Sequence, residues 1–286
     1  MEFIDQLAEK SKYIIREANA QFSNVCVLFS TGKDSTLLLY LIKEAFPKGV
    51  FPFSVYQIDT KMKYPEMYKF RDYISKEWDI PIGTFTYKDI IENTSPEKDV
   101  FECCNLRKTE TLKRAIKEIG FDAVITGIRW DEMAERGVER FFSPRKGGSW
   151  ELLREKMESE EGDSPFEYLQ DMEMSGWDLY ASDYGEECDH VRIHPLLHWT
   201  ELDVWKYIKK YNLPVNPLYF SKGGKRYRSL GCMPCTYPID SKASNIDEII
   251  EELEKNLKSD DFIEERSGRN LDKEKIQRRL RALGYM

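Results

Sequence analysis

The stretch Val25-Cys26-Val27-Leu28-Phe29-Ser30-Thr31-Gly32-Lys33-Asp34-Ser35-Thr36-Leu37-Leu38-Leu39 decides the fold of this chain. Its first residues form a short apolar run, which is typical of a buried parallel strand. Its last residues begin a second apolar run through Ile42, which is better explained as a helix because a lysine and a glutamate follow and Pro47 ends it. We therefore predict a strand, a tight polar turn over residues 30–35 and a helix.

The turn between this strand and this helix has the composition of an anion-binding site. In such a unit the backbone N–H groups and the positive end of the helix dipole point at one place. Gly32 would let the backbone approach an anion, and Lys33 would supply a point charge. An ordinary strand-to-helix turn, in which Ser, Gly and Asp are common, is the alternative. The spacing is not that of the Walker motif, which has four residues between its glycine and a Gly-Lys pair.

Length and composition bound the class of protein. The chain has 286 residues, of which 41% are hydrophobic and 13% aromatic, enough for one large domain or a domain with an appendage. The net charge of −8 argues against a general nucleic-acid coat protein, although a local basic patch is compatible with it. No apolar run approaches the length of a membrane span, and residues 1–5 do not resemble a signal peptide. We expect a cytoplasmic protein that does not enter a membrane.

Strand and helix patterns alternate along most of the chain. Beyond the first strand and its helix, strands are predicted over residues 50–58, 82–87, 123–126 and 191–196, and helices over 2–22, 65–78, 108–119, 204–211 and 246–257. This alternation predicts an α/β fold, a doubly wound parallel sheet with helices on both faces. Ligands bind such sheets outside the carboxyl ends of the strands. Ser30 to Ser35, Asp59-Thr60 and Gly127 to Arg129 follow predicted strands, so we expect them to converge on one site.

The chain is predicted to have one main domain and a smaller appendage. The main domain would cover residues 1–220, with an insertion over about 141–190 in which no clean periodicity is present. That insertion is either a lid with short helices or a solvated surface loop. Residues 221–286 would form a smaller C-terminal helical and loop region. Basic residues in this region could contact a nucleic-acid backbone or line a solvated helix face: Lys222 to Arg228, Arg266, Arg269, Arg278, Arg279 and Arg281.

Six cysteines in a reducing compartment are better explained as ligands, nucleophiles or core residues than as disulfides. Cys103-Cys104 and the C-x-x-C segment Cys232-Met233-Pro234-Cys235 form two pairs. Four thiolates suit an iron–sulfur cluster or, less easily, tetrahedral zinc. Two buried cysteines and a chance C-x-x-C are the alternative. Cys26 is expected in the core, and Cys188 is expected to be incidental.

The surroundings of the first cysteine pair also favour metal binding. Cys103 and Cys104 are predicted to precede a helix start, where N–H groups and the helix dipole stabilise thiolates. Arg107 and Lys108 would add positive charge and lower the pKa of the two thiols. The two cysteine pairs would tie the C-terminal region to the sheet.

The turn over 30–35 resembles the PP-loop, S-x-G-K-D-S, of enzymes that split ATP between its α and β phosphates. Beyond this turn, nearly the whole chain resembles one family with a PP-loop, HUP-like fold related to the adenine nucleotide alpha hydrolases. That family holds the assimilatory adenylylsulfate and phosphoadenylylsulfate (PAPS) reductases, the small subunit of bacterial ATP sulfurylase and the PP-loop component of DNA phosphorothioation systems. Segments 53–72, 126–140, 191–218 and 226–286 resemble the sulfurylase subunit, whereas 102–108 and 229–236 resemble the cluster-binding reductases.

The resemblance implies ATP, Mg²⁺ and a [4Fe–4S] cluster as cofactors. It implies a nucleotide-binding set of Ser30, Thr31, Gly32, Lys33, Asp34, Ser35, Thr36, Asp59 and Gly127. The residues expected to act in catalysis are Lys33, Asp34, Arg129 and Arg140. The two carboxylates, Asp34 and Asp59, would position Mg²⁺ or the loop, and the arginines would neutralise phosphate or the acceptor. The cluster would be held by Cys103, Cys104, Cys232 and Cys235.

Two departures from the family pattern decide between its members. The reductases carry a catalytic cysteine near the C-terminus, and this sequence has none after Cys235. The sulfurylase small subunit ordinarily lacks the four-cysteine set. We therefore predict a PP-loop ATP pyrophosphatase that adenylates an oxyanion acceptor, of the DNA phosphorothioation type, with a cysteine desulfurase or another sulfur donor as partner.

Three other functions stay open at this point. The first alternative is the sulfate-activating small subunit, which makes adenylylsulfate from ATP and sulfate and needs a GTPase subunit as partner. A reductase that lacks its C-terminal cysteine is less favoured. A non-catalytic nucleotide or iron–sulfur sensor would bind ATP without releasing pyrophosphate. In each case the chain could also form a homo-oligomer.

Overall fold

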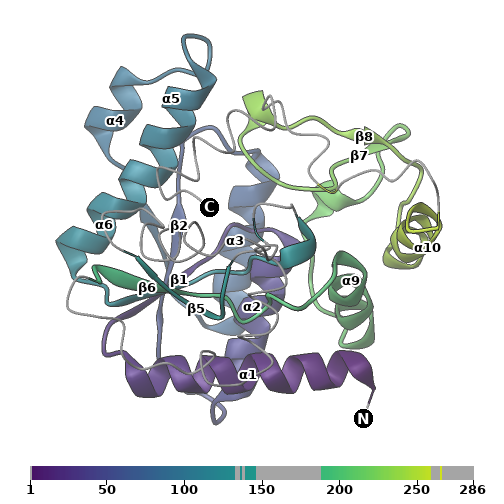
Figure 1. Cartoon of the computed structure of the whole chain (residues 1–286). Helices are drawn as coiled ribbons and strands as arrows, with labels where there is room; N and C mark the ends of the chain where they lie inside the picture. The colour runs from purple at the N-terminus through teal and green to yellow at the C-terminus, as the bar shows by residue number, and fades with distance from the viewer. Residues whose placement is uncertain (1, 133–135, 137–138, 146–187, 259–264, 266–286) are drawn as a thin grey trace, which may run out of the picture.

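A six-stranded sheet forms the centre of the molecule (Figure 1). The computed structural model describes residues 2–132, 136, 139–145, 188–258 and 265, and the structural findings concern these residues. The sheet has the order β3-β2-β1-β4-β6-β5. Its strands are β1 (Val25–Leu28), β2 (Ser54–Ile58), β3 (Ile82–Phe85), β4 (Ala123–Ile125), β5 (Phe142–Arg145) and β6 (His190–Ile193).

Five of the six strands run parallel, as the alternating sequence pattern predicted. β1 pairs with β2 and with β4, β2 pairs with β3, and β4 pairs with β6, all in parallel register. The sixth strand, β5, pairs antiparallel with β6 at the edge of the sheet. This strand lies within the insertion predicted over about 141–190, where the sequence predicts short helices or a surface loop and no strand. A four-residue strand that contains Pro144 has no periodic pattern, and an edge strand tolerates a proline because one side of it carries no partner strand.

The helices cover both faces of the sheet. They are α1 (Phe3–Gln21), α2 (Lys33–Ala45), α3 (Pro65–Trp78), α4 (Lys88–Asn93), α5 (Val100–Cys104), α6 (Thr111–Ile119), α9 (Glu201–Lys210) and α10 (Ile246–Asn256). All except α4, α5 and the start of α6 lie close to their predicted bounds. Local signals explain several ends. Pro65 occupies the first turn of α3, Gly120 ends α6 at φ 76°, and Thr200 forms a capping box with Asp203 at the start of α9.

Successive side chains of β1 point alternately into two hydrophobic cores. Val25 and Val27 point into the larger core, which is shared with buried residues of α1, α2, α3 and α9. Cys26 points the other way, into a smaller core that includes Leu112 and Ile116 of α6. Because side chains on a strand alternate between faces, these two cores lie on opposite sides of the sheet (Figure 1). The prediction of helices on both faces is confirmed.

The helix predicted to begin at Lys108 begins earlier. α5 starts after Asp99, whose side chain accepts a hydrogen bond of 3.0 Å from Glu102 N. A π-helical turn over Asn105–Glu110 then leads directly into α6. Cys103 and Cys104 therefore lie in the last turn of α5 and not before a helix start. The dipole argument for stabilised thiolates fails for these two residues, because they lie within a continuous helical stretch and not in front of its first turn.

The chain after α9 packs onto the main core. Two short strands, β7 (Lys225–Arg226) and β8 (Ile239–Asp240), form an antiparallel pair. Helix α10 packs on α9, and its Ile249 and Leu253 belong to the larger core. Among the described residues, no helix combines the length and the apolar character needed to cross a bilayer.

Replacing Ile125 by alanine should lower the free energy of unfolding by about 2–4 kcal/mol, because this central β4 side chain is fully buried and the change leaves a cavity. Ile119→Ala is the matched control. Ile119 is 44% exposed at the end of α6, so its loss should cost only a few tenths of a kcal/mol. Urea denaturation of both variants measures the difference. Equal losses would contradict the assignment of β4 to the centre of the core.

Candidate functional site

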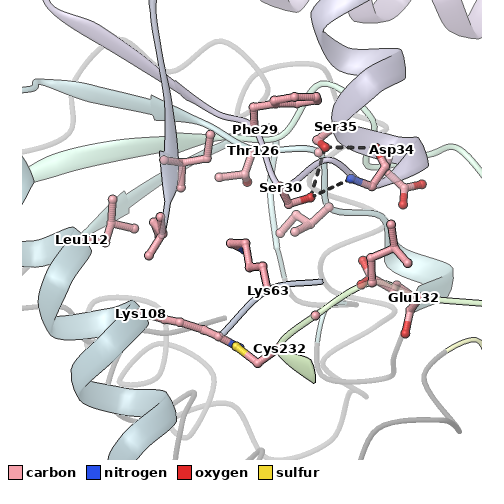
Figure 2. Close-up of a pocket in the computed structure, with 18 of the residues that line it drawn as sticks. Phe29, Ser30, Asp34, Ser35, Lys63, Lys108, Leu112, Thr126, Glu132 and Cys232 are labelled. Carbon is pink, nitrogen blue, oxygen red and sulfur yellow. Dashed lines mark hydrogen bonds between the residues drawn. The ribbon is translucent and has the colours of Figure 1, made fainter. Parts of the chain in front are cut away.

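A cavity of about 280 Å³ opens at the carboxyl edge of the sheet (Figure 2). Its wall is built from residues that follow β1, β2, β4 and β6, together with α6 and the chain near Cys232. One end is apolar and is lined by Leu28, Ile58 and Leu112. Most of the other lining residues are polar, although Phe29, Ile128 and Leu230 also belong to the wall. This combination of an apolar pocket and a few convergent polar groups is typical of a small-ligand site.

The polar turn after β1 forms one side of this cavity. Ser30, Gly32, Asp34 and Ser35 line it. The hydroxyls of Ser30 and Ser35 lie 3.0 Å apart, and the Ser35 hydroxyl donates to the carbonyl of Gly32 over 3.0 Å. Thr31 has a φ of 68°, which is unfavourable for a β-branched residue. Strained backbone of this kind is commonly retained at functional turns.

The turn and the chain that follows β4 approach each other closely at Gly127. A Cβ atom on Gly127 would lie 3.2 Å from the backbone carbon and oxygen of Asp34. The Lys33 N–H also donates over 2.9 Å to the buried hydroxyl of Tyr219. The start of α2 is therefore held between the end of β4 and the chain that follows α9.

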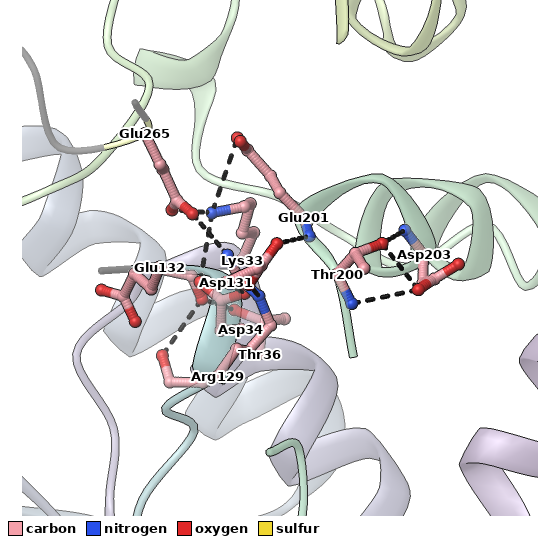
Figure 3. Close-up of polar contacts among 12 residues, drawn as sticks. Lys33, Asp34, Thr36, Arg129, Asp131, Glu132, Thr200, Glu201, Asp203 and Glu265 are labelled. Carbon is pink, nitrogen blue, oxygen red and sulfur yellow. Dashed lines mark hydrogen bonds and ion pairs between the residues drawn. The ribbon is translucent and has the colours of Figure 1, made fainter. Parts of the chain in front are cut away.

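A buried ion cluster lies directly beside the turn (Figure 3). Lys33 Nζ contacts one carboxylate oxygen of Glu265, lies 3.2 Å from Asp34 Oδ2 and lies 3.9 Å from Glu201 Oε1. The Arg129 guanidinium contacts Asp34 and Glu265 as well. Lys33 and Arg129 are 1% and 0% exposed, so both positive charges are removed from water and paired with carboxylates.

Two further ion pairs extend the cluster. Arg129 Nε donates to Asp131 Oδ1 over 2.9 Å, and Arg228 donates to Glu201 Oε2 over 2.8 Å. Asp131 Oδ2 in turn accepts a 2.6 Å hydrogen bond from Glu201 N at the start of α9. The cluster thus joins the turn, the segment after β4, the first turn of α9 and the chain near Arg228.

Burial and the neighbouring charges act against each other on the pKa values in this cluster. Burial alone would lower the pKa of Lys33, but the carboxylates of Asp34, Glu265 and Glu201 outweigh it and raise that pKa. Burial would likewise raise the pKa of Glu265, but Arg129 and Lys33 hold it below its usual range. For Asp131, burial prevails and raises the pKa. Lys33 and Glu265 are therefore a charged pair at neutral pH.

The predicted site residues fall into three groups. Ser30, Gly32, Asp34, Ser35 and Gly127 line the cavity. Four others do not line it: Thr31, Lys33, Thr36 and Arg129 are buried beside it. Lys33 and Arg129 are connected to the cavity through Asp34 and Glu265, which do line it.

Asp59 and Arg140 lie outside the cavity wall. Asp59 pairs with Lys61 at 2.7 Å and accepts a 2.8 Å hydrogen bond from the Tyr68 hydroxyl. Burial would raise the pKa of Asp59, but the bonds from Lys61 and Tyr68 lower it. The backbone carbonyl of Arg140 faces the ring of His194, at 2.8 Å from Nδ1.

The four predicted cluster cysteines line one small cavity of about 20 Å³. Cys232 also lines the larger cavity, and its Sγ lies 3.2 Å from Thr60 Oγ1. The thiols suit a soft metal chemically, but the space between them is little more than a water molecule needs. Within the described ranges, no three Cys, His, Asp or Glu side chains are grouped so that they could hold a metal ion.

The pKa of the Cys103 thiol is not lowered as predicted. Burial raises the pKa of the Cys103 thiol, and the nearby Arg107 only partly offsets it. Arg107 is occupied elsewhere, because it donates to the Thr94 hydroxyl and to the carbonyl of Thr60, each over 2.7 Å. Arg107 therefore connects the helical stretch that contains the two cysteines to the segment that follows β2.

Two arginines of the basic segment Lys222 to Arg228 are buried in ion pairs inside the protein. Arg226 is 1% exposed and pairs with Glu252 at 2.6 Å, and Arg228 pairs with Glu201. The prediction that these two arginines could meet a nucleic-acid backbone was therefore wrong. The predicted arginine clusters at 266–281, and most of the predicted insertion, lie outside the described residues.

Sequence reasoning missed several residues of the site. They are Glu201 and Glu265 of the ion cluster, Tyr219 behind the turn, and Arg192 and His194 in the cavity wall. Only Glu201 had a local signal, as an acid after the Thr200 helix cap, and that signal indicated a helix start and not a partner for Lys33. Each of the others reaches the site through contacts between distant parts of the chain.

Comparison with known proteins agrees with this geometry. A subunit of sulfate adenylyltransferase, subunit 2 from Zymomonas mobilis, is 33% identical over 94% of this chain and 92% of the relative. Subunit 2 of sulfate adenylyltransferase from Pseudomonas fluorescens is 32% identical over 87% of this chain and 88% of its own length.

Solved structures show the same fold at lower identity. The phosphoadenylyl-sulfate reductase of Candida auris has a TM-score of 0.51 and 19% identity, and the match covers 81% of this chain and 97% of that one. The FMN adenylyltransferase of Candida glabrata in complex with ATP has a TM-score of 0.54 and 17% identity over 94% of this chain and 88% of that one. The family model described as phosphoadenosine phosphosulfate reductase domain matches residues 24–238, well over half of the chain. The predicted PP-loop fold is thus confirmed, and the chain belongs to the phosphoadenosine phosphosulfate reductase domain family.

Proposed function

We propose that this protein transfers the adenylyl group of ATP to sulfate and releases pyrophosphate, as a subunit of a sulfate adenylyltransferase. The observation that carries the proposal is the similarity to sulfate adenylyltransferase subunit 2 along nearly the full length of both chains. It favours sulfate activation over the DNA phosphorothioation function that the cysteine pattern had suggested. The name of these relatives implies a second subunit, which by family resemblance would be a GTPase.

The cavity suits ATP in its two parts. The apolar end at Leu28, Ile58 and Leu112 offers flat contact for an adenine ring. The serine hydroxyls of the turn and the N-terminus of α2 offer donors and positive potential for phosphate. Asp34 and Glu132 are hard oxygen ligands in the same wall, the donor type that Mg²⁺ prefers. Mg²⁺ bound with ATP would neutralise charge on the phosphates.

The ion cluster supports the chemical step. As pyrophosphate leaves, negative charge develops on its oxygens and must be stabilised by fixed positive charge. Lys33 and Arg129 provide two such charges, and both contact Glu265, which lines the cavity. A phosphate group that takes the place of the Glu265 carboxylate would meet both cations. The bond from the attacking sulfate oxygen to the α-phosphorus forms as the bond from that phosphorus to the bridging oxygen breaks.

Lys33→Ala should lower the rate of pyrophosphate release by about 10²–10³-fold, because one charge-assisted contact to the leaving group is lost. The assay follows pyrophosphate released from ATP in the presence of sulfate. Lys43→Ala is the matched control, since Lys43 lies exposed in the last turn of the same helix, and it should keep the wild-type rate.

Urea denaturation of Lys33→Ala separates a catalytic loss from unfolding, because Lys33 is buried among carboxylates. A folded variant with near-normal turnover would contradict the role of Lys33. A wild-type protein that binds ATP but releases no pyrophosphate, with or without a GTPase subunit, would instead favour a nucleotide sensor.

Sulfate should stimulate pyrophosphate release by the wild-type protein, and double-stranded DNA should not. The pairing of Arg226 and Arg228 inside the protein supports this outcome, because those charges cannot also contact a DNA backbone. The measurement compares release rates with sulfate, with DNA and with neither. Stimulation by DNA alone would overturn sulfate as the acceptor and restore the phosphorothioation function.

We also propose that Cys103, Cys104, Cys232 and Cys235 hold one [4Fe–4S] cluster. Their convergence on one cavity, from segments about 130 residues apart in sequence, supports this proposal. A cluster needs more room than the cavity now has, so the four side chains must move outward to bind it. The chemistry that a cluster would supply is electron transfer or the structural crosslinking of two distant segments.

Anaerobic purification should yield about four irons and four sulfides per chain with visible absorption, as expected for one cubane cluster. Cys232→Ser should lose this absorption and the iron. Cys188→Ser is the control, because Cys188 does not line the cavity, and it should keep both. Stoichiometric zinc, or an active enzyme without metal, would contradict the cluster assignment.

A further inference from the structure

His194 lies in the cavity wall and has no role in the proposed reaction described above. It follows β6 directly and is 0% exposed, and it lines the cavity together with Thr126 and Arg192. Thr126 N donates over 2.9 Å to the carbonyl of Ile193, so the ends of β4 and β6 are aligned beside each other. The ring therefore sits at a defined place on the carboxyl edge of the sheet.

The contacts of the ring decide which of its nitrogens carries the proton. Nδ1 lies 2.8 Å from the carbonyl oxygen of Arg140. A carbonyl oxygen can only accept a hydrogen bond, so Nδ1 carries the hydrogen and donates it. Burial lowers the pKa of His194 to about 4, which keeps the ring neutral at pH 7. Nε2 is then unprotonated and can only accept.

Several charged groups face this ring and are compatible with that state. Glu139 Oε2 lies 3.6 Å from Nδ1, on the side of the ring that carries the hydrogen. Arg145 and Arg192 add positive charge that disfavours a second proton on the ring. The neutral form with a bare Nε2 is thus fixed by its surroundings.

Nε2 of His194 is buried and has no hydrogen-bond partner in the part of the chain that the structure describes. A buried acceptor without a partner is costly, and such groups in native proteins call for an explanation. Because His194 lines the nucleotide cavity, a bound ligand can supply the missing donor. Sulfate is a poor partner for this atom, since the dianion has no hydrogen to donate.

The donors that ATP can offer are the amino group of adenine and the two ribose hydroxyls. The apolar end of the cavity, where adenine fits, is formed at β1, β2 and α6. His194 follows β6, which is separated from β1 by β4. Two strand spacings amount to about 10 Å. If the ribose lies next to β4, the amino group of an adenine at the apolar end is therefore too far from the His194 ring to donate to it.

We propose that His194 Nε2 accepts a hydrogen bond from a ribose hydroxyl of the bound nucleotide and so selects ribonucleotides over deoxyribonucleotides. This assignment rests on the proposed function, because it assumes that ATP occupies the cavity. It makes His194 a binding and specificity residue. The step involves no covalent change.

Isothermal titration of the wild-type protein with ATP, 2′-deoxy-ATP and 3′-deoxy-ATP tests the assignment directly. One of the two deoxynucleotides should bind about tenfold more weakly than ATP, because the buried Nε2 then loses its donor. The weaker analogue identifies the hydroxyl. If ATP and both analogues bind with equal affinity, this assignment is overturned and the proposed function stands. If ATP does not bind at all, both are overturned.

Two substitutions separate the role of Nε2 from that of Nδ1. In His194→Asn the amide nitrogen can replace Nδ1 and still donate to the Arg140 carbonyl, but no acceptor reaches the position of Nε2. In His194→Gln an amide oxygen can occupy that position. His194→Asn should bind ATP and the weaker analogue within about twofold of each other, while His194→Gln should keep most of the preference.

Thermal unfolding with and without nucleotide confirms that each variant is folded before its affinities are compared. A folded His194→Asn protein that still prefers ATP about tenfold would overturn the role of His194. Loss of the preference in both variants would also overturn it, because the two differ in whether an acceptor remains at the position of Nε2.

Discussion

The buried pairing of Lys33 and Arg129 with carboxylates is the constraint on which the site depends. A buried positive charge is costly unless it is paired, and here both cations contact the same residue, Glu265, as well as Asp34. The partners come from parts of the chain that are far apart in sequence, from the turn after β1 to the C-terminal side of α10. Because Lys33 and Arg129 each contact carboxylates from several segments, the buried charges are fully compensated only when these segments keep one arrangement.

Close backbone packing has a comparable effect on the turn itself. Gly127 allows β4 to approach the start of α2, and the Tyr219 hydroxyl accepts from the Lys33 N–H. In this arrangement the backbone of Thr31 has an unfavourable positive φ. As a result the hydroxyls of Ser30 and Ser35 are presented to the cavity from a rigid frame, which is what recognition of phosphate requires.

The two cavities share part of their walls. Thr60, Lys108 and Cys232 line both the larger cavity and the small one between the cysteines. Arg107, in the turn that follows Cys104, adds a second connection because it donates a hydrogen bond to the carbonyl of Thr60. A change in the cysteines, such as binding of a metal, would therefore change the wall of the larger cavity. This arrangement physically connects the four-cysteine set to the larger cavity.

The sequence by itself determined the strand, turn and helix around Gly32, the order of the five parallel strands, and the convergence of Ser30 to Ser35 with Gly127, because local periodicity and parallel-sheet geometry are sufficient for these. Only the tertiary structure decided that Lys33 is paired with Glu201 and Glu265, that Arg226 and Arg228 are turned inward, and that His194 presents a bare nitrogen to the cavity. The physical reason is the same in each case. A charged or polar side chain has the same local sequence signal whether it faces water or a buried partner, and that choice is made by distant segments that pack against it.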